Sequence, residues 1–302
     1  GGLVKRGIYA INNSAAPVLA PAETEWTTQT NSGYVTASFD FYKTFYLDGT
    51  WRIDQSSTLP DGENVYDYPS VTAAFIPSEL LKVDWLNFWK IRANYAEVGG
   101  TADPYLTATY YTPAGTFASD AGSVGLFNSQ TTNPNPNLKP QRSKEFEVGT
   151  ELHFLRDRIT LDFAYYKTKT LNQIIPNLPI STASGLRYAS INAGQIDNKG
   201  YEVQLGLVPI KTANIGWNID VNWSKNENTV VSLLHNDKTD VSNLLLNSFQ
   251  GGVSLNAREG EAWGTLIGSD YVYLNGQRVV GSNGSYLKSS NQGIRKTTPH
   301  KI

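Results

Sequence analysis

The chain of 302 residues carries 25 Lys and Arg against 27 Asp and Glu, giving a net charge of -2, and contains no cysteine. Nucleic acid is not expected as a partner, because no basic surplus is present to neutralise phosphates. Disulfides, thiolate metal sites and cysteine nucleophiles are excluded, and the three scattered histidines match no metal-binding motif, so no cofactor is expected. No apolar run reaches the eighteen or so residues of a transmembrane helix, whereas the strands of a membrane barrel carry a far weaker signal.

Apolar and polar residues alternate with a period of two in several segments, which is the pattern of half-buried β-strands. No segment has a comparable helical period. In the first third of the chain, the predicted elements are strands at 35–41 and 45–53 joined by a turn at 42–44, weaker strands at 71–75 and 89–95, and a short helical turn within 77–86.

The most regular alternation begins at residue 145. A charged turn at 155–157 separates two alternating segments, 145–154 and 159–166, so a tight hairpin is predicted. In the first segment, apolar side chains share one face and polar side chains the other: Phe146, Val148, Leu152 and Phe154 against Glu145, Glu147, Glu151 and His153.

The same design recurs further along the chain. Strands are predicted at 201–207 and 217–223, with a turn at about 209–216. If one face meets lipid, the other lines the interior of a barrel. The polar residues predicted to face that lumen are Glu145, Glu147, Glu151, Glu202, Gln204, Asn218, Asp220 and Asn222.

The connections alternate between short and long. Short turns are predicted at 42–44, 155–157 and 209–216; long loops are predicted at 54–68, 99–143 and 168–197, and from 226 onward. Outer-membrane barrels have short periplasmic turns and long extracellular loops. The loops at 99–143 and 168–197 are therefore the expected places for extracellular contacts with substrate or a partner.

Alternation alone suits a membrane barrel and a soluble β-sandwich equally well. Three features favour the barrel: apolar faces nine to eleven residues long, the phase of the loop lengths, and the aromatic pairs Trp217/Trp223 and Phe45/Trp51. Each pair lies about 20 Å apart along its strand at ~3.3 Å per residue, which suits two aromatic girdles. The predicted fold is all-β, an antiparallel transmembrane barrel represented by about ten to twelve strands of a larger one.

Two other interpretations are kept. A soluble carbohydrate-binding β-sandwich would use Tyr110, Tyr111, Tyr188 and Tyr201 as sugar platforms. A secreted hydrolase would need paired carboxylates, for which Glu145, Glu147 and Glu151 are candidates, although a solvated polar stripe is the commoner role of such residues. The loops 61–64 and 236–240 contain possible Ca²⁺ ligands without the EF-hand spacing.

Several motifs resemble the SusC/RagA-type TonB-dependent transporters of Bacteroidetes outer membranes. The most distinctive is NPNLKPQRSKEFEVG at 135–149, which resembles that family's entry into a barrel strand, with Gln141 where Glu is common. Further similar stretches are FAYYKTKT at 163–170, NKGYE at 198–202, WNIDVNWSKN at 217–226, YLDGTWR at 46–52, YPSV at 68–71 and REGEAWG at 258–264.

The resemblance implies a nutrient importer of the Gram-negative outer membrane and not an enzyme. It implies contact with outer-membrane lipid, a SusD-like lipoprotein as partner, an oligosaccharide or peptide as substrate, and energy from the TonB–ExbB–ExbD complex. The N-terminal plug and TonB box of such transporters have no counterpart here. Residues 1–294 are expected to be a barrel fragment, and the basic residues 295–302 a non-native tail.

Overall fold

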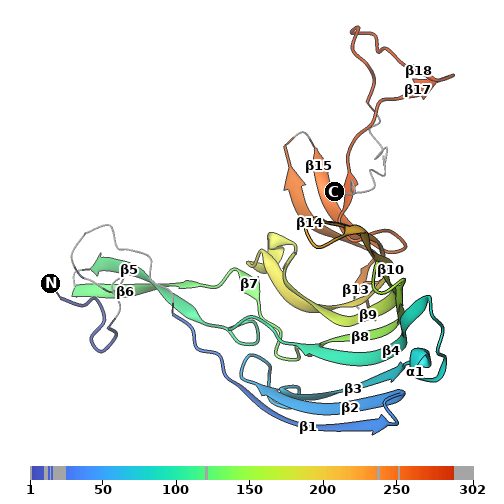
Figure 1. The fold of residues 1–302 in the computed structure, drawn as a ribbon. Coiled ribbons are helices and arrows are strands. Elements are labelled where there is room, and N and C mark those ends of the chain that lie inside the picture. Colours follow the sequence, from blue (N-terminus) through green and yellow to red (C-terminus); the bar gives the residue numbers. More distant parts are fainter. Residues whose placement is uncertain are drawn as a thin grey trace.

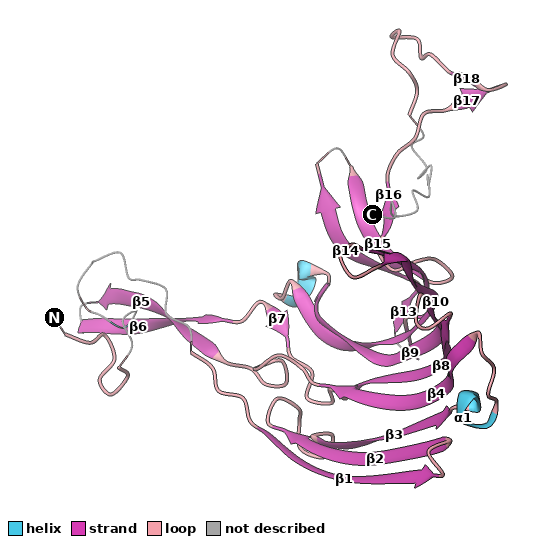
Figure 2. Ribbon diagram, in the orientation of Figure 1, coloured by secondary structure: helices cyan, strands magenta, loops and turns pink. Residues whose placement is uncertain are grey.

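The structure is a computed structural model that describes residues 2–9, 13, 15, 25–119, 122–236, 239–250 and 252–288. Strands dominate it, as Figure 2 shows. No helix among these residues is long and apolar enough to cross a membrane. The predicted tail at 295–302 lies outside the described residues.

One large curved sheet forms the body of the molecule (Figure 1). Eight strands follow one another antiparallel in chain order, and a ninth, β7, adds a short parallel pair with β10. Within the described chain the sheet does not close, so β1 and β11 lie at its two edges. The eight strands are β1 (Thr30–Phe41), β2 (Phe45–Ser56), β3 (Val65–Phe75), β4 (Leu86–Gly100), β8 (Gln141–Phe154), β9 (Ile159–Pro179), β10 (Tyr188–Lys211) and β11 (Gly216–Ser232).

The connections at one end of the sheet are short, as predicted. The turn between β8 and β9 places Leu155, Arg156 and Asp157 at positive φ, the backbone conformation of a tight hairpin turn. The helix α1 (Pro77–Leu80) confirms the predicted helical turn. The turn predicted at 209–216 is shorter in the structure, because β10 continues to Lys211 after a register shift between Leu207 and Ile210.

At the other end, part of the predicted loop regions is strand. The prediction of a loop at 168–197 was wrong: β9 and β10 pair through most of it, leaving only residues 180–187 as a connection. The loop after β2 likewise shortens to 57–64, and β11 extends past residue 226. Strands that project beyond a bilayer have water on both sides, so their backbone pairing continues without the apolar alternation that sequence reading depends on.

Smaller strands decorate the same end. The predicted loop at 99–143 contains the hairpin β5 (Tyr111–Ser119) and β6 (Gly122–Ser129), which projects from the main sheet in Figure 1, followed by β7 (Thr132–Asn133). A 3-10 turn, η2 (Thr182–Ser184), lies between β9 and β10. After β11 come β12 (Leu234–Asn236), β13 (Thr239–Val241), β14 (Asn243–Phe249), β15 (Val253–Arg258), β16 (Thr265–Ile267), β17 (Tyr273–Leu274) and β18 (Gln277–Arg278).

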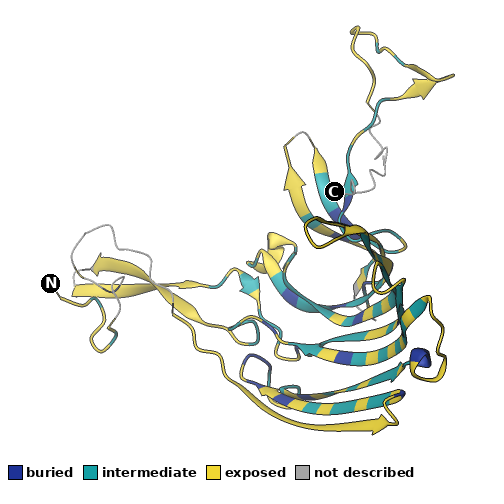
Figure 3. Cartoon of the chain, viewed as in Figure 1, coloured by how far each residue is buried: buried dark blue, intermediate teal, exposed yellow. Residues whose placement is uncertain are grey.

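The two faces of the main sheet differ in composition. Apolar side chains on the outer face are unusually exposed, among them Val35 (62%), Trp51 (57%) and Trp223 (53%). The polar side chains on the inner, concave face are mostly half-buried, which gives the strands their striped colouring in Figure 3. Classical hydrophobic cores are confined to the loop end, around Leu138 with Leu59 and around Val230 with Leu244.

Candidate functional site

The eight polar residues predicted to face a lumen all lie on the inner face of the sheet. Strand alternation puts them there together, since successive side chains point to opposite faces. The register aligns four neighbouring strands at one level, where Glu151 of β8 faces Asp162 of β9, Asp162 faces Gln204 of β10, and Gln204 faces Asn222 of β11. This row is the centre of the candidate site.

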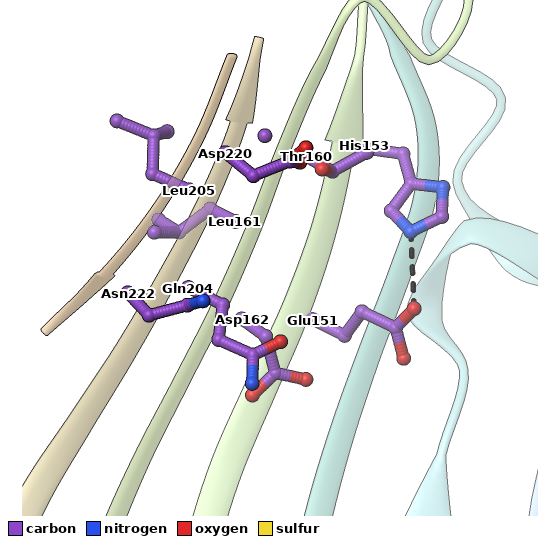
Figure 4. A pocket seen from close by; sticks show the side chains of 10 residues that line it. Glu151, His153, Thr160, Leu161, Asp162, Gln204, Leu205, Asp220 and Asn222 are labelled. Carbon is purple, nitrogen blue, oxygen red and sulfur yellow. Dashed lines mark hydrogen bonds and ion pairs between the residues drawn. The ribbon is translucent and has the colours of Figure 1, made fainter. Parts of the chain in front are cut away.

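A hollow of about 250 Å³ lies over this row (Figure 4). Asp220 joins it from β11, opposite Gly206. A side chain at Gly206 would collide with the hydroxyl of Thr160, 2.4 Å from an added Cβ, so the glycine keeps the floor of the hollow open. The lining is polar and open to solvent, which suits contacts with hydroxyl or amide groups.

His153 closes one side of the hollow. Its ring nitrogens lie 3.0 Å from Glu151 Oε1 and 3.1 Å from Asp157 Oδ1. In Figure 4 the His153 ring points toward Glu151, along the bond that the dashed line marks. The contact with Asp157 ties the inner face to the short turn that follows β8.

Arg92 organises the neighbouring part of the face and was not singled out in the sequence. From β4, its guanidinium donates to both carboxylate oxygens of Asp162 on β9, at 2.8 and 2.9 Å, and to Glu147 on β8 at 3.1 Å. Bidentate pairing of this kind is among the stronger polar contacts in proteins. Its position within the alternation of 89–95 was the available signal, but the partners become apparent only from the strand register.

The remaining predicted residues are less closely grouped. Glu145 accepts a hydrogen bond of 2.8 Å from the Thr168 hydroxyl. Glu202 faces Ala164 on β9. Asn218 lies where the register between β10 and β11 shifts, so it has no direct cross-strand partner.

The hypothesis of paired catalytic carboxylates has no geometric support. Glu145, Glu147 and Glu151 each engage a different partner, respectively Thr168, Arg92 and His153. The tyrosines proposed as sugar platforms do not gather either: Tyr110 and Tyr111 lie at the projecting hairpin, and Tyr188 and Tyr201 are about 40 Å apart along β10 at ~3.3 Å per residue. The described residues contain no group of three His, Asp or Glu placed to hold a metal ion.

A second polar cluster lies near the mouth, at the loop end of the inner face. Asp54 on β2 is 5% exposed and accepts hydrogen bonds from Arg52, at 2.9 Å, and from the Tyr68 hydroxyl. The neighbouring ring of Tyr66 packs with Leu138 of the connection before β8. Loop residues thus fold over the inner face at this end.

Comparison with known proteins agrees with this architecture. The family model described as TonB dependent receptor-like, beta-barrel matches residues 5–299. The TonB-dependent receptor P3 of Formosa agariphila is 27% identical over 251 residues, covering 81% of this chain and 25% of the relative. The TonB-dependent receptor SusC of Bacteroides thetaiotaomicron is 24% identical over 248 residues, covering 80% and 24%.

Among solved structures, the RagAB peptide transporter superposes with a TM-score of 0.73 at 18% identity, covering 88% of this chain and 29% of that one. This likeness concerns the fold. The chain spans about a quarter of the length of the curated relatives that it matches. Since the family model covers nearly the whole sequence, the chain belongs to the TonB dependent receptor-like, beta-barrel family.

Proposed function

We propose that this chain forms part of the wall of an outer-membrane, TonB-dependent importer, with the inner polar face lining the lumen. In this proposal Glu145, Glu147, Glu151, Glu202, Gln204, Asn218, Asp220 and Asn222 face the transport path. The protein acts by transport and not by catalysis. Family membership supports the proposal, and one feature of the fold carries it.

That feature is the opposite character of the two faces along eight paired strands. Large apolar side chains on the outer face are exposed, such as Phe39 (54%) and Trp217 (53%), while the other face holds the ion-pair network of Arg92. Contiguous apolar surface on this scale is rare on soluble monomers. Lipid outside and water inside satisfy both faces at once.

The proposed substrate is an oligosaccharide or a peptide, captured with a SusD-like lipoprotein at the loop end. The names of two similar proteins support these classes, SusC for the curated relative and a peptide transporter for RagAB. The segments 101–140 and 180–187 are the proposed contact regions for substrate or lipoprotein. Energy would come from the TonB–ExbB–ExbD complex acting on the intact receptor.

The absence of cysteine allows a direct test of the two faces. Adjacent residues of β11 provide a matched pair, Val221→Cys facing lipid and Asn222→Cys facing the lumen, each introduced into the intact receptor in cells. Fluorophore at position 221 should be quenched by spin-labelled lipid, and position 222 should react with a charged, water-soluble maleimide. Equal reaction of both positions with the charged reagent, without quenching, would contradict the membrane placement.

Uptake is tested separately. Deleting the gene should slow growth on one class of polymer, either oligosaccharide or peptide, and deleting TonB should give the same defect. Restoring the intact gene serves as the control. Unchanged growth and uptake on both classes would contradict an importing role while leaving the membrane placement to the cysteine test.

A further inference from the structure

The outer face changes abruptly from apolar to basic at one level of the sheet. On β8 to β11, the outward positions just beyond Phe146, Tyr165, Tyr201 and Trp223 are all occupied by lysine. We call these residues, with the next outward lysine of β9, the basic collar: Lys144, Lys167, Lys169, Lys199 and Lys225.

The register places like charges directly opposite one another within this collar. Lys144 of β8 faces Lys169 of β9, and Lys167 of β9 faces Lys199 of β10. Directly opposed side chains have Cβ atoms about 4.5–5.5 Å apart, where like charges destabilise the pair. Two such pairs side by side call for an anion between them.

The protein supplies only part of the counter-charge. Lys144 pairs with Glu97 at 3.0 Å, and Lys225 and Lys199 share Glu227, at 2.5 and 3.6 Å. In the described chain, Lys167 and Lys169 make no ion pair, and both are exposed. Asp197 faces Lys169 in the register, but its carboxylate accepts a hydrogen bond from Gln195.

The collar lies at the level where lipid headgroups would meet the barrel. Lys167 is eight residues beyond the start of β9 at Ile159, about 26 Å along the strand at ~3.3 Å per residue. A tilt of about 45° reduces this to a height of roughly 20 Å, close to the ~25 Å apolar band of an outer-membrane barrel. On β3 and β4, the corresponding outward positions carry Asp67 and Glu97, so the basic collar is confined to one side of the sheet.

We propose that Lys167 and Lys169, flanked by Lys144 and Lys199, bind the phosphate groups of phosphorylated lipid in the outer leaflet. Phosphate matches the site because one anion can neutralise several ammonium groups that the register brings together. The ring of Tyr165, 5.1 Å from that of Tyr201, provides an aromatic surface for the lipid directly below the charges. This inference rests on the membrane placement proposed above.

The test uses the intact receptor, purified in neutral detergent and reconstituted in phosphatidylcholine nanodiscs, with bisphosphorylated lipid A as the probe. The double variant Lys167→Gln/Lys169→Gln should bind lipid A roughly 30-fold more weakly, about fivefold for each lysine. Lys43→Gln/Lys211→Gln, two exposed lysines at the opposite ends of the strands, is the matched control and should bind as the wild type does. Lys167→Arg/Lys169→Arg should retain binding.

Thermal stability provides a second readout that does not depend on affinity. Without an anion, the glutamine variant should melt no lower than the wild type, because it relieves like-charge repulsion; with lipid A, the wild type alone should gain stability. Unchanged lipid A binding in the glutamine variant, an equal loss in the control variant, or equal binding of dephosphorylated lipid A would each overturn the inference. Equally tight binding of inorganic pyrophosphate would overturn lipid as the source of the phosphate.

The nanodisc arm distinguishes this failure from failure of the proposed function. Receptor that enters phosphatidylcholine nanodiscs but shows no phosphate dependence would overturn the collar alone. Receptor that fails to enter any bilayer would overturn the membrane placement itself.

Discussion

Arg92 on β4 reaches across the whole of β8 to form a bidentate ion pair with Asp162 on β9. The crossing depends on Gly149, the β8 residue directly opposite Arg92, where an added Cβ would lie 2.7 Å from the guanidinium carbon. Ala164, next to Gly149 on β9, is also small. Small residues on the inner face therefore form the channel in which this long side chain lies.

Substitution of Gly149 by Ala should destabilise the sheet. The added methyl group displaces the guanidinium and weakens its bonds to Asp162 and Glu147, at a cost on the order of 1–3 kcal/mol. Gly49→Ala is the control, since its added Cβ has nothing within 4 Å. The measurement is the temperature at which the intact receptor loses its compact gel mobility; equal midpoints for the two variants would contradict the role of the channel.

Gly200→Ala should be more damaging than Gly149→Ala. Its Cβ would lie 2.6 Å from the backbone oxygen of Lys225 as well as from the Tyr166 ring, and backbone in a paired strand cannot move aside cheaply. Adding Tyr166→Ala should restore only part of the stability, because the clash with Lys225 remains. Full recovery in the double variant, by the same melting measurement, would show that the tyrosine alone causes the effect.

The contact between His235 and Glu259, beyond the membrane-spanning part of the strands, should depend on pH. Hydrogen bonds with Glu259 and then Asp240 raise the pKa of His235 above its ordinary 6.5. The stability from this contact is therefore fully present below about pH 6.5 and is lost as the pH rises through the raised value. The hydrogen bond from His235 lowers the pKa of Glu259 below 4.5, so at acid pH the contribution is lost as the pH falls through that lowered value.

Hydrogen exchange of residues 230–236, corrected for the intrinsic effect of pH, measures this dependence. Protection should be greatest between the two pKa values and should decline on either side. His235→Gln should remove the decline at higher pH. If the substituted and unsubstituted proteins lost protection in parallel above pH 6.5, the contact would not be its cause.

The chain of 302 residues by itself should not form a stable barrel in a bilayer. In the described structure, β1 pairs only with β2, and β11 pairs only with β10, so each has one edge of unpaired backbone groups. Such groups cost several kcal/mol each in hydrocarbon. Refolding the chain into lipid vesicles should give aggregated or unprotected material in a protease assay, whereas a closed, heat-resistant, protease-protected barrel would contradict this expectation.

Residue-level alternation was sufficient for the part of each strand that has different surroundings on its two faces. The hairpin of β8 and β9 was predicted with its turn because Phe146 and Glu147 differ sharply in polarity. The prediction failed for the outer ends of the same strands, around Ile174 and Ala193. There, water or other protein surrounds both faces, and local polarity no longer reports backbone pairing.

By itself, the sequence determined the strand period, the outward apolar face, the inward polar face and the position of the short turns, since each depends on neighbouring residues alone. Only the tertiary structure decided which polar groups meet. Arg92 and Asp162 are 70 positions apart, and only the register of three strands brings them together. The same register sets Lys167 against Lys199, because cross-strand contacts depend on how strands align and not on their composition.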